Sequence, residues 1–171
     1  MKKGYLQVYT GTGKGKTTAA FGTAMRTVLH GGTVYFAQFI KAARTAELLV
    51  PEHFSNFTIE QFGGGRFIEG EPSGEDIKLA EEGLLRCAEA MSSGDYDLVV
   101  MDEVNVAIHY GLLDPAAVIA AIISRSPSTE VICTGRYAPQ ELIDAADLVT
   151  EMRKVKHYFD SGVGAREGIE Y

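Results

Sequence analysis

A glycine-rich stretch near the start of the chain, TGTGKGKTT (residues 10–18), has the composition of a loop that binds phosphate. Its last part matches the final three positions, GK[ST], of the phosphate-loop pattern GxxxxGK[ST]. Thr10 stands where that pattern has its first glycine, and Gly11 follows one place later. Glycines allow backbone N–H groups to converge on an anion, and the amino end of a following helix adds positive potential. The stretch therefore predicts a nucleotide site that comprises Gly11, Thr12, Gly13, Lys14, Gly15, Lys16, Thr17 and Thr18.

Two side chains of this loop have the chemistry for a phosphate group and its metal ion. The Lys16 ammonium can reach phosphate oxygens, and one such pair at about 4 Å contributes about 4 kcal/mol at an effective dielectric constant of about 20. The Thr17 hydroxyl is positioned to bind Mg²⁺. A dinucleotide loop is a poorer interpretation, because Lys16 stands where the pattern GxGxxG has its third glycine. A plain glycine-rich turn is the remaining alternative.

A second motif, DLVVMDE (residues 97–103), ends a nearly continuous apolar run with two carboxylates. Such a run is typical of a strand that is buried on both faces of a parallel sheet. Its carboxyl end is where Mg²⁺ beside a phosphate loop finds hard oxygen ligands. Asp102 and Glu103 can each bind the ion directly or through water, and the sequence leaves both possibilities open. The alternative is an acidic strand end with no ligand.

Two arginines are candidates for contact with a nucleotide. Arg136 follows another apolar run, ICTG, at the same expected edge of the sheet, where it can neutralise triphosphate charge or form a surface ion pair. Arg26 lies farther along the helix that follows the phosphate loop, and its role is equally open.

The elements that must position these residues alternate between strand and helix. Strands are predicted over 5–9, 33–39, 57–61, 97–101, 129–134 and 148–151, and helices over 16–29, 74–91, 115–123 and 139–146. This alternation predicts an α/β fold of three layers, a parallel sheet with helices on both faces. We see no internal repeat or linker, so residues 1–171 are expected to form a single domain.

Composition excludes several classes of protein. The chain has 171 residues and a net charge of −7, so it has no basic surplus for general binding to nucleic acid or anionic membranes. Cys87 and Cys133 lack the CxxC spacing of a zinc site or redox motif, and reduced thiols are expected. No signal peptide or membrane span is apparent, which favours a cytoplasmic protein.

Several segments together resemble one family. GKGKTTAA, QFIK (residues 38–41), DLVVMDEVN, TGR and above all the ending VTEMRKVKHYFDSGVGAREGIEY are similar to ATP:corrinoid adenosyltransferases of the BtuR/CobA/CobO type. The resemblance runs from about residue 5 to residue 171. The phosphate loop is common to many nucleotide-binding proteins, whereas the ending is far more specific to this family.

The resemblance implies a RecA-like P-loop fold, a homodimer and transfer of the 5′-deoxyadenosyl group of ATP to the Co(I) centre of a corrinoid, with release of triphosphate. It implies that ATP lies in the loop in the opposite sense to most P-loop enzymes. It also implies catalytic roles for Lys16, Thr17 and Glu103, an Mg²⁺ or Mn²⁺ ion at Thr17 and Glu103 with Asp102 nearby, and nucleotide contacts for Arg26 and Arg136. A flavoprotein is the expected electron donor for Co(I).

The chain departs from the family pattern in two places. Many members carry an N-terminal extension that helps cover the active site, and this chain starts almost on its first strand. Many also have a Phe-x-Trp pair after the third strand that keeps the lower face of the corrinoid free of a ligand, and this chain has no tryptophan. Phe62 or Phe67 can substitute there, and His109 and His157 are further candidates for corrinoid contact.

Three functions remain as hypotheses. The first is corrinoid adenosylation. The second is a P-loop ATPase or kinase that cleaves the γ-phosphate, with Glu103 positioning water or an acceptor. The third is a module that binds nucleotide or corrinoid without turnover. The acceptor in the first hypothesis is either cobalamin or a precursor such as cob(I)yrinic acid a,c-diamide.

Overall fold

A single six-stranded sheet organises the molecule. The computed structural model describes residues 3–42, 45–65 and 70–171, and all statements about its structure refer to these residues. All strands of the sheet are parallel, in the order β3-β2-β4-β5-β1-β6. Their bounds are β1 Leu6–Thr10, β2 Val34–Phe39, β3 Phe57–Phe62, β4 Leu98–Asp102, β5 Glu130–Thr134 and β6 Leu148–Glu151. The carboxyl ends of the strands therefore meet at one edge.

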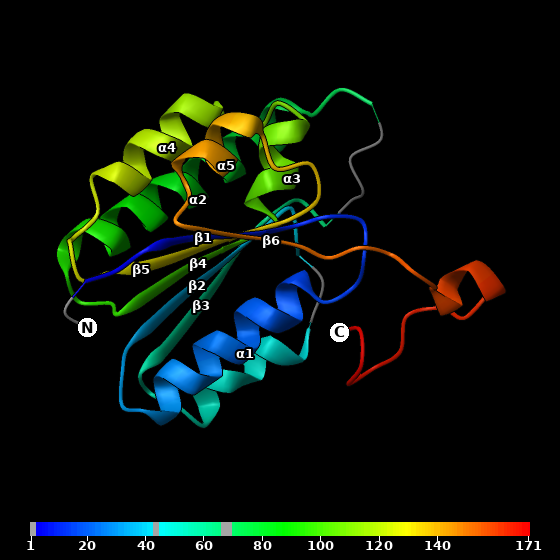
Figure 1. Cartoon of the computed structure of the whole chain (residues 1–171), viewed down its shortest axis with the longest axis horizontal. Coiled ribbons are helices and arrows are strands. Elements are labelled where there is room, and N and C mark those ends of the chain that lie inside the picture. Colours follow the sequence, from blue (N-terminus) through cyan, green and yellow to red (C-terminus); the bar gives the residue numbers. More distant parts are fainter. Residues whose placement is uncertain (1–2, 43–44, 66–69) are drawn as a thin grey trace.

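Helices cover both faces of this sheet (Figure 1). One face is covered by α1 (Lys16–Leu29) and the short 3₁₀ helix η1 (Ala46–Glu52). The other face is covered by α2 (Gly74–Ser93), α3 (Val104–His109), α4 (Pro115–Ile123) and α5 (Gln140–Ala145). The predicted three-layer α/β fold is confirmed.

The alternation of side chains along the strands divides the core into two clusters. On β2, Tyr35, Ala37 and Phe39 pack toward α2, whereas Val34 and Phe36 pack toward α1. Successive side chains of a strand point to opposite faces, so a strand between two helical layers is buried on both faces and is mostly apolar. All six residues of β2 are accordingly buried.

The predicted boundaries agree with the structure to within about two residues, and the caps explain why. Helix α2 begins after Ser73, whose hydroxyl accepts the Asp76 N–H while the Asp76 carboxylate accepts the Ser73 N–H. It ends at Gly94, which has a φ of 77°. Helices α3 and η1 are not predicted from the sequence, because six or seven residues are too few to establish a helical period.

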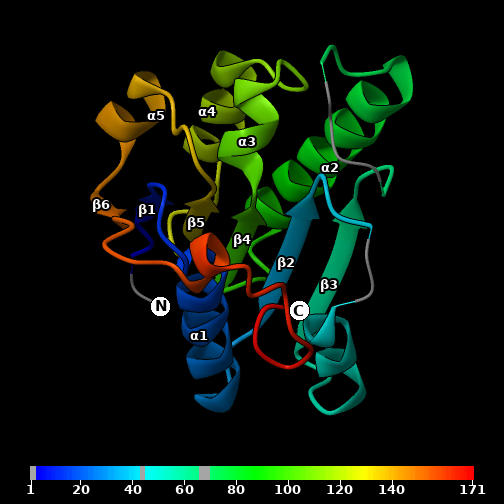
Figure 2. The ribbon, with the colours of Figure 1, turned by 90° about the vertical axis from the view of Figure 1, so that its right-hand side faces the viewer.

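The C-terminal segment leaves the sheet after β6 and runs across the phosphate loop. Figure 2 shows it in front of the upper end of α1, with the short 3₁₀ helix η2 (Tyr158–Ser161) within it. The Lys14 ammonium donates a hydrogen bond to the carbonyl of Ile169 at 3.2 Å and lies 3.4 Å from the Glu170 carboxylate. These contacts hold the C-terminal segment against the outer end of the loop. None of the helices that the structure describes is long and apolar enough to span a membrane.

Candidate active site

The phosphate loop connects β1 to α1 at the carboxyl edge of the sheet. Thr10 is still part of β1, where it pairs with Glu151 of β6. The left-handed backbone conformation falls instead on Gly11 and Gly15, with φ values of 98° and 118°. Only glycine adopts such values without strain. Thr10 can therefore stand in place of the usual first glycine, because the turn starts one residue later.

The loop has two sides, which contact different parts of the chain. We call Lys16 and Thr17, which face Asp102 of β4, the inner side of the loop. We call Gly13 and Lys14, which face the C-terminal segment, the outer side. The Gly13 N–H donates to the Met152 carbonyl at 2.6 Å, so the residue after β6 holds the outer side in place.

On the inner side, the Lys16 ammonium is folded back onto its own loop. It donates to the carbonyls of Gly11 at 3.0 Å and Gly13 at 2.7 Å, and Lys16 is only 8% exposed. This burial lowers the pKa of Lys16, while the nearby Glu103 carboxylate acts in the opposite direction. An anion in the loop would offer the ammonium a charged partner in place of the two carbonyls.

Asp102 is the centre of a buried hydrogen-bond network. Its Oδ1 accepts hydrogen bonds from the hydroxyls of Thr17 at 2.8 Å and Thr134 at 2.6 Å. Its Oδ2 forms an ion pair with the Lys41 ammonium at 2.7 Å, and the carboxylate is fully buried. Burial on its own would lower the pKa of Lys41, but the Asp102 and Glu103 charges more than offset it and raise the pKa. Asp102 thus links β4, β5, α1 and the loop after β2.

Glu103 follows directly and lies at the start of α3. Its backbone is left-handed, with a φ of 63°, and its N–H donates to the Thr134 hydroxyl at 3.0 Å. Burial raises the pKa of the Glu103 carboxyl, and the Asp102 charge raises it further. The cationic groups of Lys41 and Lys16 oppose this shift. Because Asp102 has three partners of its own, Glu103 is the more available carboxylate for a cation.

The residues on the inner side have the chemistry of a magnesium site. The Thr17 hydroxyl lies 2.8 Å from a buried carboxylate, and a second carboxylate comes next in the chain. The part of the chain that the structure describes contains no cluster of three or more His, Cys, Asp or Glu residues that could hold a metal by themselves. Mg²⁺ is usually bound through one or two carboxylates together with substrate phosphates, so the predicted ligands Thr17, Asp102 and Glu103 suit it.

The two predicted arginines lie in different places. The charge of Arg136 acts on both Lys16 and Glu103, so the loop after β5 brings it to the site. Arg26 is exposed in the last turn of α1, ten residues beyond Lys16 and therefore about 15 Å along the helix. The structure does not bring Arg26 to the phosphate loop.

Among the described residues, the predicted corrinoid contacts Phe62, His109 and His157 lie in different places. Phe62 is 7% exposed and packs against Phe39, with ring centroids 6.0 Å apart, and against Gly83 of α2. In this structure Phe62 is thus mainly a core residue, and its contact with a corrinoid stays a prediction. Phe67 lies outside the described residues.

The two predicted histidines lie in different surroundings. His109 ends α3 and stacks on Tyr137, with ring centroids 4.1 Å apart. Tyr110 and Tyr137 are exposed, which gives this end of α3 an accessible aromatic surface beyond β4 and β5. His157 instead lies near the outer side of the loop, and its Nδ1 accepts the Phe159 N–H at 3.1 Å.

Two features of the site were missed from the sequence. Lys41 stands within the stretch QFIK, and nothing in its spacing predicts a partner on β4. Its position depends on the pairing of β2 with β4, in which Gln38 lies beside Asp102, and on the left-handed conformation of Ile40, with a φ of 63°. The contact between Gly13 and Met152 was equally hidden, since it joins residues far apart in the sequence.

Comparison with known proteins places this site in a family. The family model of ATP:corrinoid adenosyltransferases BtuR/CobO/CobP matches residues 2–171. A corrinoid adenosyltransferase from a Sinorhizobium species is 39% identical over 99% of this chain and 81% of its own length. The corresponding protein of Pseudomonas aeruginosa is 39% identical over 99% and 85%, and the corrinoid adenosyltransferase CobA of Salmonella typhimurium is 37% identical over 99% and 87%.

A solved structure supports the fold. The crystal structure of the RadB recombinase superimposes with a TM-score of 0.57 at 13% identity, over 91% of this chain and 77% of that one. At this identity the likeness shows the fold alone, and it confirms the expected RecA-like architecture. With a full-length family match and a phosphate loop facing buried carboxylates, the chain belongs to the family of ATP:corrinoid adenosyltransferases.

Proposed function

We propose that this single-domain protein transfers the 5′-deoxyadenosyl group of ATP to the Co(I) centre of a corrinoid and releases triphosphate, in the biosynthesis or salvage of adenosylcobalamin. The observation that carries the proposal is the family match over residues 2–171. The geometry agrees with it, because the inner side of the loop presents a lysine and a hydroxyl to paired carboxylates.

The reaction makes modest demands on the protein. The Co(I) substrate attacks C5′, a Co–C bond forms, and the C5′–O bond to the α-phosphate breaks with its electron pair going to the oxygen. Co(I) is already a strong nucleophile, so no side chain has to remove a proton. The enzyme must align the two substrates and stabilise the negative charge that grows on the triphosphate.

The residues of the inner side suit this second task. Lys16 can exchange its two loop carbonyls for oxygens of the leaving group, which raises its pKa again and retains its positive charge. Arg136 adds positive charge nearby. Bound Mg²⁺ or Mn²⁺ would supply Lewis-acid stabilisation of the phosphate oxygens. We assign Thr17 and Glu103 as the residues that would bind the ion directly and Asp102 as the residue that holds the Thr17 hydroxyl.

The surroundings of Asp102 argue against a role for this residue in cleavage of the γ-phosphate. A kinase or ATPase of this fold needs a group that positions water or an acceptor at the γ-phosphate. The Asp102 carboxylate is fully buried and has three partners, so it is not available for that role. Glu103 is the carboxylate that could position water or an acceptor, so γ-phosphate cleavage is the alternative that the assay must test.

Three further features belong to the proposal. The nucleotide lies with its α-phosphate on the inner side, where Lys16 and the metal ligands can act on the breaking bond. The enzyme works as a homodimer, and a flavoprotein supplies the electrons that make Co(I). The acceptor is cobalamin or cob(I)yrinic acid a,c-diamide.

An anaerobic assay tests the reaction and the acceptor together. The purified protein is incubated with ATP, Mg²⁺ and either corrinoid reduced to Co(I). We expect loss of the Co(I) absorbance with formation of one triphosphate per Co–C bond, faster with the natural acceptor. ADP and phosphate as the only nucleotide products would show γ-phosphate cleavage, and nucleotide binding without turnover would indicate a binding module.

A further inference from the structure

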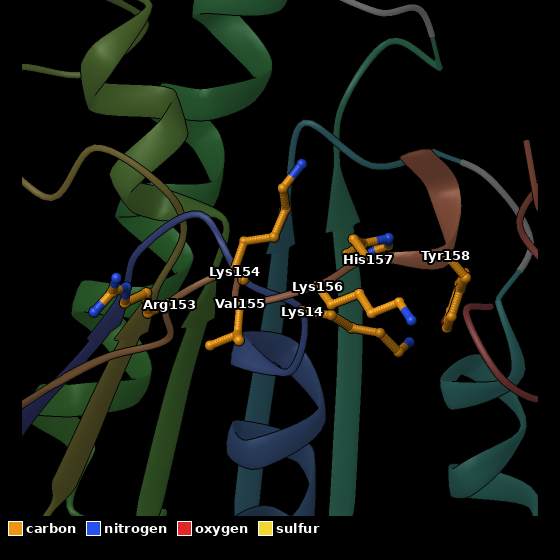
Figure 3. Close-up of a pocket in the computed structure, with 8 residues that line it drawn as sticks. Lys14, Arg153, Lys154, Val155, Lys156, His157 and Tyr158 are labelled. Atoms are coloured by element: carbon orange, nitrogen blue, oxygen red, sulfur yellow. The ribbon is translucent and has the colours of Figure 1, made fainter. Parts of the chain in front are cut away.

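A pocket of about 230 Å³ lies on the outer side of the phosphate loop (Figure 3). Gly13 and Lys14 of the loop line it, and the C-terminal segment supplies the remaining wall, formed by Arg153, Lys154, Val155, Lys156, His157 and Tyr158. The chain as a whole carries a net charge of −7, yet none of the described residues that line this pocket is acidic. Its composition suits an anion.

The basic side chains of the pocket differ in how far they are already paired. Lys14 lies beside Glu170, and Lys154 forms an ion pair with Asp160 at 2.9 Å. Within the described part of the chain, the Arg153 guanidinium and the Lys156 ammonium have no hydrogen-bond or ion-pair partner. Figure 3 shows Lys14 and Lys156 extending in the same direction toward Tyr158, although two like charges repel each other. An anion between them would relieve this repulsion.

On the outer side of the loop, the backbone has one N–H donor fewer for an anion. Phosphate loops bind anions through backbone N–H groups. Here the Gly13 N–H is already used, because it donates to the Met152 carbonyl at 2.6 Å. The contact that removes this donor brings in the segment that carries Arg153 and Lys156. Side-chain cations on the outer side therefore take the place of a backbone donor.

The proposed direction of the nucleotide identifies which anion reaches this pocket. The α-phosphate must lie on the inner side, near Lys16 and the carboxylates of the metal site. The terminal phosphate is the end of the triphosphate farthest from the reacting carbon. It should therefore lie on the side of the loop that is opposite to Lys16, which is the outer side. Four of the eight residues that line the pocket are cationic, so a charged phosphate suits it better than a neutral adenine base.

We infer that the pocket between the outer side of the loop and the C-terminal segment binds the terminal phosphate of ATP, with Lys156 as its principal side-chain contact. The inference rests on the proposed function for the orientation of ATP. It makes the C-terminal segment part of the nucleotide site and gives the enzyme a means to distinguish triphosphate from diphosphate nucleotides. It also predicts that the segment holds the product triphosphate after the Co–C bond has formed.

Calorimetric titration of the full-length protein with inorganic triphosphate and with pyrophosphate, in the presence of Mg²⁺, tests this inference without corrinoid. In Lys156→Gln the affinity for triphosphate should fall about fivefold, which corresponds to the largest free energy usual for an exposed ion pair. The affinity for pyrophosphate should change less than about twofold. Lys156→Arg should restore most of the loss, and Arg153→Gln combined with Lys156→Gln should increase it.

Lys78→Gln is the matched control, because Lys78 is an exposed lysine of α2 on the other face of the sheet. It removes the same charge and should leave both affinities unchanged. Unchanged triphosphate binding in Lys156→Gln, or equal losses for triphosphate and pyrophosphate, would overturn the inference.

The same variants in the Co(I) assay separate this pocket from a corrinoid site. We expect Lys156→Gln to raise the KM for ATP and to leave the KM for either corrinoid unchanged. A raised KM only for cob(I)yrinic acid a,c-diamide, which carries free carboxylates, would assign the pocket to those carboxylates and overturn the inference. If the wild-type protein makes ADP, the proposed function fails by its own assay, independently of the binding titration.

Discussion

The two sides of the phosphate loop differ in how their charges are balanced. On the inner side, Lys16, Lys41 and Asp102 are buried or partly buried and already have partners within the chain. On the outer side, Lys156 and Arg153 are exposed and have no partner among the described residues. A buried charge without a partner is costly, whereas an exposed one is stabilised by water. The inner side is thus organised before ligands bind, and the outer side is left to respond to them.

The largest expected effect comes from removing the cation of the inner side. Lys16→Ala removes the charge that faces the leaving group, and we expect kcat/KM for adenosyl transfer to fall by about 10²–10³-fold, as for loss of one preorganised charge-stabilising donor. Steady-state measurement of Co–C bond formation checks this. Lys78→Ala, which removes an exposed lysine from α2, should retain full activity. A Lys16→Ala enzyme with wild-type turnover would remove the inner side from the mechanism.

A second substitution breaks the network that organises the inner side. Asp102→Asn leaves the Lys41 ammonium without its ionic partner and removes the charged acceptor of the Thr17 and Thr134 hydroxyls. Because Lys41 is partly exposed, we expect a loss of about 2 kcal/mol in the free energy of unfolding, less than for a fully buried pair.

Chemical denaturation of both forms measures this loss. Asp95→Asn, at an exposed position, is the control and should change the free energy of unfolding by less than about 0.5 kcal/mol. Equal stability of Asp102→Asn and the wild type would mean that Lys41 and Asp102 are not paired in solution.

The contact between the two regions can be tested at Gly13. A Cβ at this position would lie 2.7 Å from the Met152 carbonyl oxygen, so Gly13→Ala must push the C-terminal segment away from the loop. We expect a destabilisation of about 1–3 kcal/mol by overpacking, together with weaker binding of triphosphate. Thermal unfolding and titration with inorganic triphosphate measure the two effects.

Gly22→Ala provides a control with the opposite sign. Gly22 lies within α1, and a Cβ there meets nothing within 4 Å. Alanine should stabilise the helix by about 0.5–1 kcal/mol and leave ligand binding unchanged. If Gly13→Ala were as harmless as Gly22→Ala, the loop would not be held by Met152.

The smallest expected effect is a dependence of metal binding on pH. Burial raises the pKa of Glu103 in the metal-free protein, and a bound cation favours the carboxylate, so binding of Mg²⁺ with ATP should release a proton. The affinity for Mg²⁺ with ATP should therefore rise with pH by at most about tenfold per pH unit, starting below the ordinary carboxyl range. Above the raised pKa of Glu103 the affinity should level off.

Titration calorimetry in buffers of different ionisation enthalpy measures the released proton. The same titration with Glu103→Gln should show weaker binding and little dependence on pH in this range. A dependence that persists unchanged in Glu103→Gln would assign the proton to another group.

Much of the framework was predictable from the sequence because it depends on local chemistry. Every residue of β2 and β4 is buried, and apart from Gln38 and Asp102 all of them are apolar, a pattern typical of strands covered on both faces of a sheet. Ser73 and Gly94 mark the ends of α2 through capping interactions within a few residues. Gly15, Lys16 and Thr17 are recognisable because a phosphate loop brings its groups together within one turn of chain.

Contacts between residues that are distant in the sequence were decided only by the tertiary structure. The sequence by itself determined the three-layer α/β fold, the phosphate loop and the pair of carboxylates at the end of β4. The order of strands and their register decided that Lys41 and Thr134 meet at Asp102, and that Phe62 lies in the core. The path of the chain after β6 decided that Met152 occupies the Gly13 N–H and that Lys156 lies beside Lys14. Side-chain types indicate which interactions are possible, whereas contacts across a sheet depend on long-range packing that no local pattern records.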